Sequence, residues 1–536
     1  MLSKSNTIGR WLLLIVLSYV SIAQAECPVD LTHARVTVWD YQDQTDSHED
    51  LCRTREWLLG RHEATVPVRA NVLDLCDTLT GNGTVWLVEG PLPYSRWNDS
   101  PDFTVSGRGI EVHSNGFPVA RLNYTGGRAG RIRALHARQR QLRPYDPQRD
   151  GLILSNTWGD RHRFERINES AMFRELEAAA ALGVDVMQID AGWAVVNDMP
   201  RENITGKGEW QRYWNLPKGC WAVNTNRFPH GLRPLTNAAR AKGMAFGLWF
   251  APDSSDDSAR WRSDADILLG LWRNEGVRFF KTDFMTTASA SGLARQRAFY
   301  DAVIDGSGGE VSFDLDITGQ VPRPGYFGMP RCALFVENRY HRPKDGRLWW
   351  PHKTLRNLWT LAEAVDPVRL RMEFMNPSLH KELYGNSPLA PFRWPADTLF
   401  ATVMAASPLA WMDCIDVTPE IMSKWKPLIA TWKRERQRWH GGSIIPIGAR
   451  PDGISWTGFA SRDADGRGGY ALLFRELANE DSFTIDLRDL TDNPSTAKVI
   501  AGRGEAVVNG SRLEVNGIAK LGFLWVRLTD SIRENL

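Results

Sequence analysis

Between residues 151 and 412, short apolar runs recur, and nearly every run ends in a polar or acidic residue. The eight runs read "GLILSNTWGD", "VDVMQIDAGW", "AFGLWFAPDSS", "VRFFKTDFM", "EVSFDLDIT", "ALFVENRYH", "VRLRMEFMNP" and "ATVMAASPLAWM". Most follow one another at about 30 residues, the length of one strand and its crossover helix. Amphipathic stretches such as 170–183 and 232–244 lie between them. Continuous apolar strands that alternate with helices predict a parallel (β/α)8 barrel over residues 146–438.

A doubly wound open sheet is the alternative fold for this strand–helix alternation. Such sheets usually bind nucleotides through a glycine-rich loop after the first strand, and no such loop follows residues 151–160. The barrel is therefore favoured. One long insertion, around residues 197–223, separates the second strand from its helix.

The sequences on either side of residues 146–438 have a different residue pattern. Residues 26–145 and 439–536 contain short β-branched runs bounded by Gly, Asn and Asp, which are typical of antiparallel strands. We expect an N-terminal β-sandwich domain over 26–145 and a C-terminal β-sandwich domain over 439–536. The basic, proline-containing stretch 131–150 is interpreted as a solvated linker into the barrel.

The first 25 residues have the pattern of a secretory signal peptide. Lys4 and Arg10 precede an apolar run from Trp11 to Ala23, and "AQA" at 23–25 fits a cleavage site. We expect a periplasmic or secreted protein without a membrane anchor. An oxidising compartment would permit disulfides among the six cysteines, which are scattered and include no CxxC pair for zinc. The net charge of +2 gives no indication of a nucleic-acid partner.

Six of the eight predicted strands end in an acid. In a (β/α)8 barrel the C-terminal strand ends form the active-site mouth, so these side chains should converge. Such converging carboxylates need cations or protonation to relieve their repulsion, and Lys281, Arg323 and Arg339 are the available cations. A helix N-cap is the structural alternative for any single acid, Asp253 above all. The six acids are Asp190, Asp253, Asp283, Asp316, Glu337 and Glu373.

A pair of carboxyl groups, acting without a metal or cofactor, is typical of a glycoside hydrolase. One carboxylate attacks the anomeric carbon or activates water, and the other group protonates the departing oxygen. A metal-dependent hydrolase would normally need histidines at the strand ends. His341 is the only candidate near one, so this alternative is set aside.

Four motifs in order resemble the α-galactosidases of glycoside hydrolase family 36 and their clan relatives. They are "NTWGD" at strand one, "QIDAGW" at strand two, "RFPHGLRPLTNAARAKGMAFGLWFAPD" through strand three and "FFKTDF" at strand four. The resemblance covers about residues 151–440. It implies a barrel between two β-domains and a retaining double displacement on terminal α-galactosides.

The resemblance also implies roles for individual residues. Asp283 matches the family's nucleophile, and Lys281 matches the lysine two positions earlier that binds sugar hydroxyls. Because residues i and i+2 of a strand share a face, both should reach the pocket, where the ammonium would lower the pKa of Asp283.

The second strand matches the family's Asp-Asp-Gly-Trp motif in part. Asp190 matches one of the family's two acids that bind the sugar hydroxyls, but Ala191 replaces the other. Trp158 and Trp193 match pocket-lining aromatic positions, with core packing as the alternative for both. Asp253 or Glu373 could replace the missing carboxylate.

The general acid departs from the family's pattern. In the family the general acid follows strand six, and this position along the barrel favours Glu337. Asp316 at the end of strand five is the alternative, and Asp314 lies on the same face of strand five. Arg323, Arg339 and Glu373 are further candidates for binding substrate.

The sequence thus predicts a retaining exo-α-glycosidase, most specifically an α-galactosidase, that acts on an oligosaccharide or glycoconjugate. A transglycosidase, or a glycosidase for a related pyranose such as an α-N-acetylgalactosaminide, a β-L-arabinopyranoside or an α-glucoside, is the alternative among enzymes. A non-catalytic carbohydrate-binding barrel is the alternative from another class.

Overall fold

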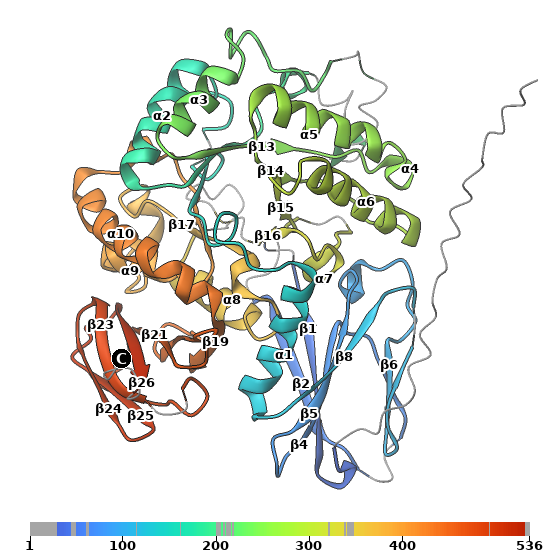
Figure 1. Ribbon diagram of the computed structural model, residues 1–536, viewed down its shortest axis with the longest axis vertical. Helices are drawn as coiled ribbons and strands as arrows, with labels where there is room; N and C mark the ends of the chain where they lie inside the picture. The colour runs from blue at the N-terminus through green and yellow to red at the C-terminus, as the bar shows by residue number, and fades with distance from the viewer. Residues whose placement is uncertain are drawn as a thin grey trace, which may run out of the picture.

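The computed structural model describes residues 29–43, 45, 50–60, 64–113, 115–160, 162–199, 205–206, 209–210, 216, 219–319, 322–336, 339, 348–491 and 494–530. Three parts follow one another along this chain: an N-terminal β-domain, a barrel and a C-terminal β-domain (Figure 1).

Eight parallel strands close into a barrel in the order β10-β13-β14-β15-β16-β17-β18-β9. The predicted barrel is therefore confirmed, with one strand inside each of the eight apolar runs. The strands are β9 (Leu154–Asn156), β10 (Val186–Ile189), β13 (Ala245–Phe250), β14 (Phe279–Thr282), β15 (Ser312–Asp316), β16 (Ala333–Phe335), β17 (Leu370–Phe374) and β18 (Ser407–Ala410).

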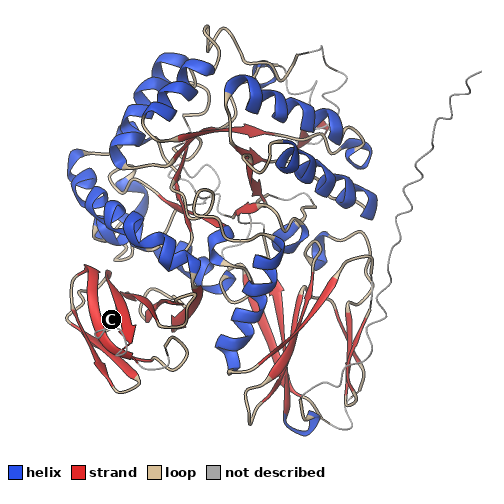
Figure 2. Cartoon of the chain, viewed as in Figure 1, coloured by secondary structure: helices blue, strands red, loops and turns tan. Residues whose placement is uncertain are grey.

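Helices surround the barrel strands, as Figure 2 shows. Local capping explains where they begin and end: the Asn168 side chain accepts a hydrogen bond from Ala171 N at the start of α2, and Gly183 ends this helix with φ 97°. The helices are α2 (Glu169–Leu182), α3 (Arg233–Ala241), α4 (Ser255–Ser258), α5 (Trp261–Glu275), α6 (Ala290–Gly306), α7 (Gly325–Gly328), α8 (Pro351–Leu361), α9 (Ala396–Ala401) and α10 (Pro419–Gly441).

The N-terminal domain contains two antiparallel sheets, ordered β2-β1-β4-β5-β8 and β3-β6-β7. The alternating runs of the sequence therefore form the expected β-sandwich. Its strands are β1 (Ala34–Tyr41), β2 (Cys52–Leu58), β3 (Val66–Val68), β4 (Val72–Asp77), β5 (Gly83–Val88), β6 (Phe103–Ser106), β7 (Gly109–Val112) and β8 (Val119–Tyr124).

The C-terminal domain also contains two antiparallel sheets, ordered β19-β20-β21-β26-β23 and β22-β25-β24. Its strands are β19 (Ser443–Gly448), β20 (Trp456–Arg462), β21 (Gly468–Arg475), β22 (Ser482–Asp486), β23 (Pro494–Gly502), β24 (Glu505–Asn509), β25 (Arg512–Asn516) and β26 (Gly522–Asp530). Within the insertion after β10, the structure describes the short pair β11 (Thr205–Gly206) and β12 (Glu209–Trp210).

The basic stretch interpreted as a solvated linker is instead largely a helix, α1 (Gly127–Leu142), with one side buried. Its arginines contact all three parts of the chain. Arg131 lies 4.3 Å from the centre of the Trp39 ring in β1, Arg140 Nε lies 2.6 Å from Asp366 Oδ2 of the barrel, and Arg133 donates to the carbonyl of Asp489. The positive charge therefore joins the domains rather than facing water.

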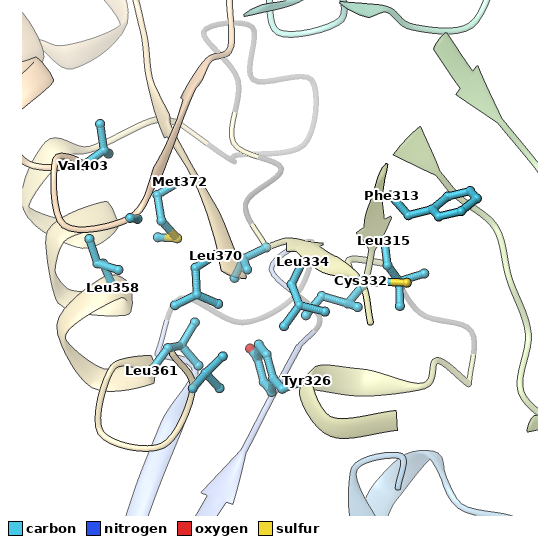
Figure 3. Packing of buried hydrophobic residues seen from close by; sticks show 14 of the residues in the cluster. Phe313, Leu315, Tyr326, Cys332, Leu334, Leu358, Leu361, Leu370, Met372 and Val403 are labelled. Atoms are coloured by element: carbon cyan, nitrogen blue, oxygen red, sulfur yellow. The ribbon is translucent and has the colours of Figure 1, made fainter. Parts of the chain in front are cut away.

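The strands and helices of the barrel pack through a continuous apolar core. Figure 3 shows part of it: Leu370 and Met372 of β17 lie beside the α8 residues Leu361 and Leu358, and Leu334 of β16 lies between β17 and the β15 residues Phe313 and Leu315. Burying each such side chain stabilises the fold by about 1.5–3 kcal/mol. This packing holds the strand ends, and so the site, in a fixed arrangement.

The five cysteines in the described part of the chain, Cys52, Cys76, Cys220, Cys332 and Cys414, are buried and form no disulfide. Cys27 lies outside the described residues. Among the described helices, none is long and apolar enough to cross a membrane.

Candidate active site

The ammonium of Lys281 lies between two carboxylates at the barrel mouth. Lys281 Nζ is 3.1 Å from Asp190 Oδ2 and 3.3 Å from Asp316 Oδ2, and all three side chains are almost fully buried. The ammonium also lies 4.3 Å from the ring centre of Phe335 and 5.2 Å from that of Trp411. The three charged side chains come from β14, the end of β10 and the end of β15, as the strand-end pattern predicted.

Asp190 is held by several donors. Asn156 Nδ2 of β9 donates to Asp190 Oδ2 at 2.9 Å, and Ala191 N donates to Oδ1 at 2.8 Å. Together with Lys281, these contacts hold the Asp190 carboxylate in one orientation at the mouth.

Asp283 follows β14 directly, and its backbone N–H continues the strand pairing to Phe250 O at 3.0 Å. Three donors surround its carboxylate. Trp249 Nε1 lies 3.3 Å from Oδ2, while Phe284 N lies 2.6 Å and Arg323 Nη1 3.5 Å from Oδ1. Phe284 has φ 54°, an uncommon conformation for a non-glycine residue that is concentrated at functional sites.

The pKa of Asp283 is raised to about 6. Removal from water is the largest cause and the negative charge of Asp316 is the next, while Lys281 and Arg323 oppose them. Lys281 lowers the pKa of Asp283 as expected, but burial and the charge of Asp316 outweigh this contribution. Asp283 is still largely ionised at neutral pH and, among the mouth acids that the structure describes, is the least buried, with 14% of its side chain exposed.

Asp316 is more deeply enclosed than Asp283. Its Oδ1 accepts hydrogen bonds from Thr318 N at 2.9 Å and Thr318 Oγ1 at 2.7 Å, while its Oδ2 faces Lys281. Asp314, on the same face of β15, pairs with Arg371 Nε at 2.8 Å. Each acid of this strand therefore has a cationic partner.

Glu373 of β17, two strands from β15 in the barrel order, is fully buried. Thr354 Oγ1 donates to its Oε1 at 3.0 Å, and Arg339 Nη1 lies 3.9 Å from the same oxygen. Burial raises the pKa of Glu373 to about 7, and Arg339 opposes this shift. Arg339 thus serves as a counter-charge for a buried acid, its structural role.

Three other predicted residues have different surroundings. Trp193 has no exposed surface, and its Nε1 donates to Trp249 O at 2.7 Å, so core packing replaces the predicted pocket lining. Trp158 is half-buried beside Phe164 and keeps an accessible face. Asp253 accepts a hydrogen bond from Ser255 N at 2.8 Å in the turn before α4, whereas the N-cap position, its expected structural alternative, is held by Ser254. Glu337 lies outside the described residues.

The sequence reading missed two site residues. Trp249 is an apolar member of β13 by pattern, yet its indole N–H donates to Asp283. Asn156 ends β9 and donates to Asp190. Both lie at the ends of barrel strands. A search for hydrogen-bond donors at strand ends, in addition to acids, would therefore have found them.

One group in the described chain has the geometry for a metal ion. Ligand atoms of His162, Asp413 and Asp416 lie within 4.8 Å of one another. Arg166 Nη1 already lies 2.8 Å from Asp413 Oδ2 and 2.5 Å from Asp416 Oδ2, supplying the positive charge there. A cavity of about 250 Å³ lies beside this group, lined by Arg166, Ala171, Met172, Arg174, Glu175, Asp413, Ile415 and Asp416.

A barrel between two β-domains, with a lysine that joins carboxylates at strand ends two and five, defines a protein with the architecture of the family 36 α-galactosidases. Comparison with known proteins confirms the resemblance: a family model named Melibiase matches residues 118–277. This match includes Asp190 and Asp253 and ends six residues before Asp283, since 283 − 277 = 6.

Curated relatives match part of the chain. A probable α-galactosidase G of Emericella nidulans is 30% identical over 136 residues, 24% of this chain and 17% of the relative. An α-galactosidase of Escherichia coli is 30% identical over 105 residues, 19% of this chain and 13% of the relative. The matched segments span less than a fifth of these relatives.

Solved structures show the fold over nearly the whole chain. The family 36 α-galactosidase AgaA of Geobacillus stearothermophilus has a TM-score of 0.63 and 13% identity, and the alignment covers 93% of this chain and 75% of that one. A variant of the same protein in complex with raffinose has a TM-score of 0.64 and 13% identity, covering 94% and 75%. The flanking β-domains therefore belong to the shared architecture.

Proposed function

We propose that this protein is a retaining exo-α-glycosidase that hydrolyses terminal α-galactosides of oligosaccharides. The observation that carries the proposal is the position of Asp283, an accessible carboxylate at the end of β14 with three hydrogen-bond donors aimed at it. The raffinose complex of AgaA supports an oligosaccharide as the substrate class.

In the proposed reaction, one oxygen of Asp283 attacks the anomeric carbon and forms a covalent glycosyl-enzyme. Trp249, Phe284 and Arg323 hold the carboxylate in one orientation, which reduces the rearrangement needed to reach the transition state. Asp190 accepts hydrogen bonds from sugar hydroxyls, and its ion pair with Lys281 at 3.1 Å holds the carboxylate in place.

The second carboxyl group must protonate the departing oxygen and later deprotonate water. Asp316 is poorly suited to this because both of its oxygens are already engaged: Thr318 N and Oγ1 donate to Oδ1, and Lys281 Nζ lies 3.3 Å from Oδ2. We therefore keep Glu337 as the proposed general acid and assign Asp316 to the charge network around Lys281.

The deciding experiment combines turnover with covalent labelling. The wild-type protein should release the aglycone from an aryl α-galactoside, and a mechanism-based fluorosugar should attach to Asp283, as peptide mass spectrometry would show. Asp283→Ala should lose turnover by at least about 10⁴-fold while its thermal unfolding remains cooperative. A label on another carboxylate would overturn the assignment of the nucleophile.

The second candidate function is a carbohydrate-binding barrel without catalysis. The low sequence identity to the solved enzymes, 13%, is the observation that keeps this candidate. Tight binding of galactosides with no turnover of any aryl glycoside would favour it. Export through the N-terminal segment is a separate proposal, and sequencing the N-terminus of the mature protein tests it.

A further inference from the structure

The backbone has an uncommon conformation directly after Asp283, the proposed nucleophile. Phe284 has φ 54°, which costs a bulky residue free energy and which glycine adopts freely. In this conformation the N–H of Phe284 lies 2.6 Å from Asp283 Oδ1. Contacts beyond Phe284 must hold the backbone in place, because the isolated segment would favour a negative φ.

The residues that follow, Thr286 and Thr287, are held by groups from other parts of the barrel. Gln296 of α6 donates from Nε2 to Thr286 O at 2.7 Å, and its Oε1 accepts from Thr287 Oγ1 at 2.7 Å. Ser254 Oγ, in the loop after β13, accepts from Thr286 N at 2.9 Å. Pro322 O accepts from Thr287 N at 2.9 Å. Both ends of the Gln296 carboxamide therefore bind this segment.

The same face of α6 contacts the chain on both sides of Asp283. Gln296 and Tyr300 are four residues apart, so they lie on one side of the helix. Tyr300 Oη lies 2.8 Å from Thr282 Oγ1, before Asp283, and 3.7 Å from Met285 Sδ, after it. Gln296 and Tyr300 are almost fully buried, so water does not compete for these hydrogen bonds.

We propose that Gln296 is a positioning residue for the nucleophile: its carboxamide holds residues 284–287 so that the Phe284 N–H stays directed at the carboxylate of Asp283. Thr282 needs no such support, because β14 pairs with a strand on each side of it. The residues after Asp283 lie beyond the strand and depend on side chains of α6 and of the β13 loop. The proposal rests on the proposed function.

The first test compares Gln296→Leu with a matched control. Gln296→Leu removes both hydrogen bonds to the segment and should lower kcat by about 10- to 100-fold, with KM within about threefold. The control is Gln139→Leu, in a buried glutamine of α1 that donates to Ala364 O at 2.6 Å and accepts from Arg369 Nη1 at 2.8 Å. These partners precede β17, away from the strand ends that form the site, so kcat should stay within about threefold of the wild type. Equal losses of kcat in both variants would overturn the proposal.

The second test uses the backbone conformation of Phe284. Phe284→Gly makes the positive φ accessible without cost, whereas Phe284→Ala removes the ring and keeps the cost. Added to Phe284→Gly, Gln296→Leu should therefore lower kcat by less than about threefold, but added to Phe284→Ala it should still cost about 10- to 100-fold. The same loss in both backgrounds would show that Gln296 does not act through this conformation, which would overturn the proposal.

The acidic limb of the kcat/KM profile gives a readout that a purely structural role would not move. Burial is the largest influence on the pKa of Asp283 and raises it, and the charge of Asp316 acts in the same direction. The groups that oppose them or donate to the carboxylate are Lys281, Arg323, the Phe284 N–H and Trp249 Nε1. A misdirected Phe284 N–H should move the limb to higher pH in Gln296→Leu, and an unmoved limb would contradict the proposal.

A wild-type protein without any turnover would overturn the proposed function instead. Amide hydrogen exchange then tests the hold of Gln296 on its own: exchange in residues 284–287 should be at least about tenfold faster in Gln296→Leu and unchanged in Gln139→Leu. Unchanged exchange in Gln296→Leu would overturn the inference. If Gln296→Leu does not fold, Gln296→Met, which keeps the unbranched shape of the side chain, takes its place in every comparison.

Discussion

The ammonium of Lys281 lies 3.1 Å from the carboxylate of Asp190, reaching across the intervening strand β13 from β14 to the end of β10. The sequence placed Lys281 beside Asp283, two residues away on the same strand face. In the structure, Lys281 forms ion pairs with Asp190 and Asp316. It affects the pKa of Asp283 only through its charge, without a direct contact. The lysine therefore holds three strands of the mouth in one charge network.

Removing this cation should destabilise the protein. Lys281→Met leaves Asp190 and Asp316 buried without their shared partner, and such a loss costs about 3–5 kcal/mol. Denaturant unfolding measures the change. The control is Lys242→Met, which removes an exposed pair with Glu177 at 2.8 Å and should cost less than about 1 kcal/mol. Equal costs for both variants would contradict a buried network.

The assignment of the general acid can be tested by leaving-group dependence. In Glu337→Ala, an aryl galactoside with an acidic phenol leaving group needs little protonation, so its hydrolysis should be impaired far less than that of a natural disaccharide. Asp316→Ala should impair both substrates alike. If the selectivity appears in Asp316→Ala and not in Glu337→Ala, the two roles are exchanged.

The pH profile should report the ionisation of Asp283. The raised pKa of about 6 predicts that kcat/KM rises with pH through about 6, as the nucleophile loses its proton. Asp316 contributes to this raised pKa, so Asp316→Asn should shift the acidic limb to lower pH. Initial rates at substrate concentrations well below KM measure this limb. A shift to higher pH would contradict the electrostatic role given to Asp316.

Substrate specificity should depend on Ala191, which stands where the family has a carboxylate. A hydrogen bond to a charged group contributes about 1.5–3 kcal/mol, so its loss should reduce discrimination by about 10- to 100-fold. Aryl α-galactoside, α-glucoside, α-N-acetylgalactosaminide and β-L-arabinopyranoside would be compared as substrates. Ala191→Asp should increase the preference for galactoside. A wild-type preference above about a thousandfold would mean that another residue replaces the missing acid.

Stability should fall as the pH rises from mildly acidic to mildly alkaline. Burial raises the pKa of Asp160 to about 8 and that of Glu175 to about 7, so the folded protein binds more protons than the unfolded chain across this range. Since the unfolded state then binds fewer protons, the free energy of unfolding decreases with pH, for Asp160 between about 4 and 8.

Asp160→Asn should flatten this dependence. Asp160 Oδ2 accepts a hydrogen bond from Asp413 N at 2.9 Å, which an asparagine oxygen can replace, so the fold should tolerate the change. Thermal unfolding midpoints between pH 4 and 8 measure the slope, with the exposed Asp99→Asn as control. An unchanged slope in Asp160→Asn would show that this carboxyl does not titrate as described.

Much of the architecture followed from the sequence because periodicity is a local property. The apolar runs at about 30-residue spacing predicted the barrel, and the acids at strand ends predicted which side chains would converge. Asp190, Asp283 and Asp316 were identified in this way, and the strand that carries each of them was placed correctly. The same reasoning assigned the flanking β-domains from the alternation of short strands.

Other features depended on which segments meet in space, which local pattern does not encode. The sequence left pocket lining and core packing open for Trp193, and packing against Trp221 and Trp249 buries it completely. The arginines of α1 looked like a solvated linker, yet acids and an aromatic ring of other domains surround them.

The sequence by itself determined the strands, their order and the acids that end them, because apolar periodicity and strand-end position are written along the chain. Only the tertiary structure decided which charges pair, that the arginines of α1 contact all three parts of the chain, and how far burial raises the pKa of Asp283. Those outcomes depend on distances between residues far apart in sequence and on the exclusion of water, which arise when the domains pack.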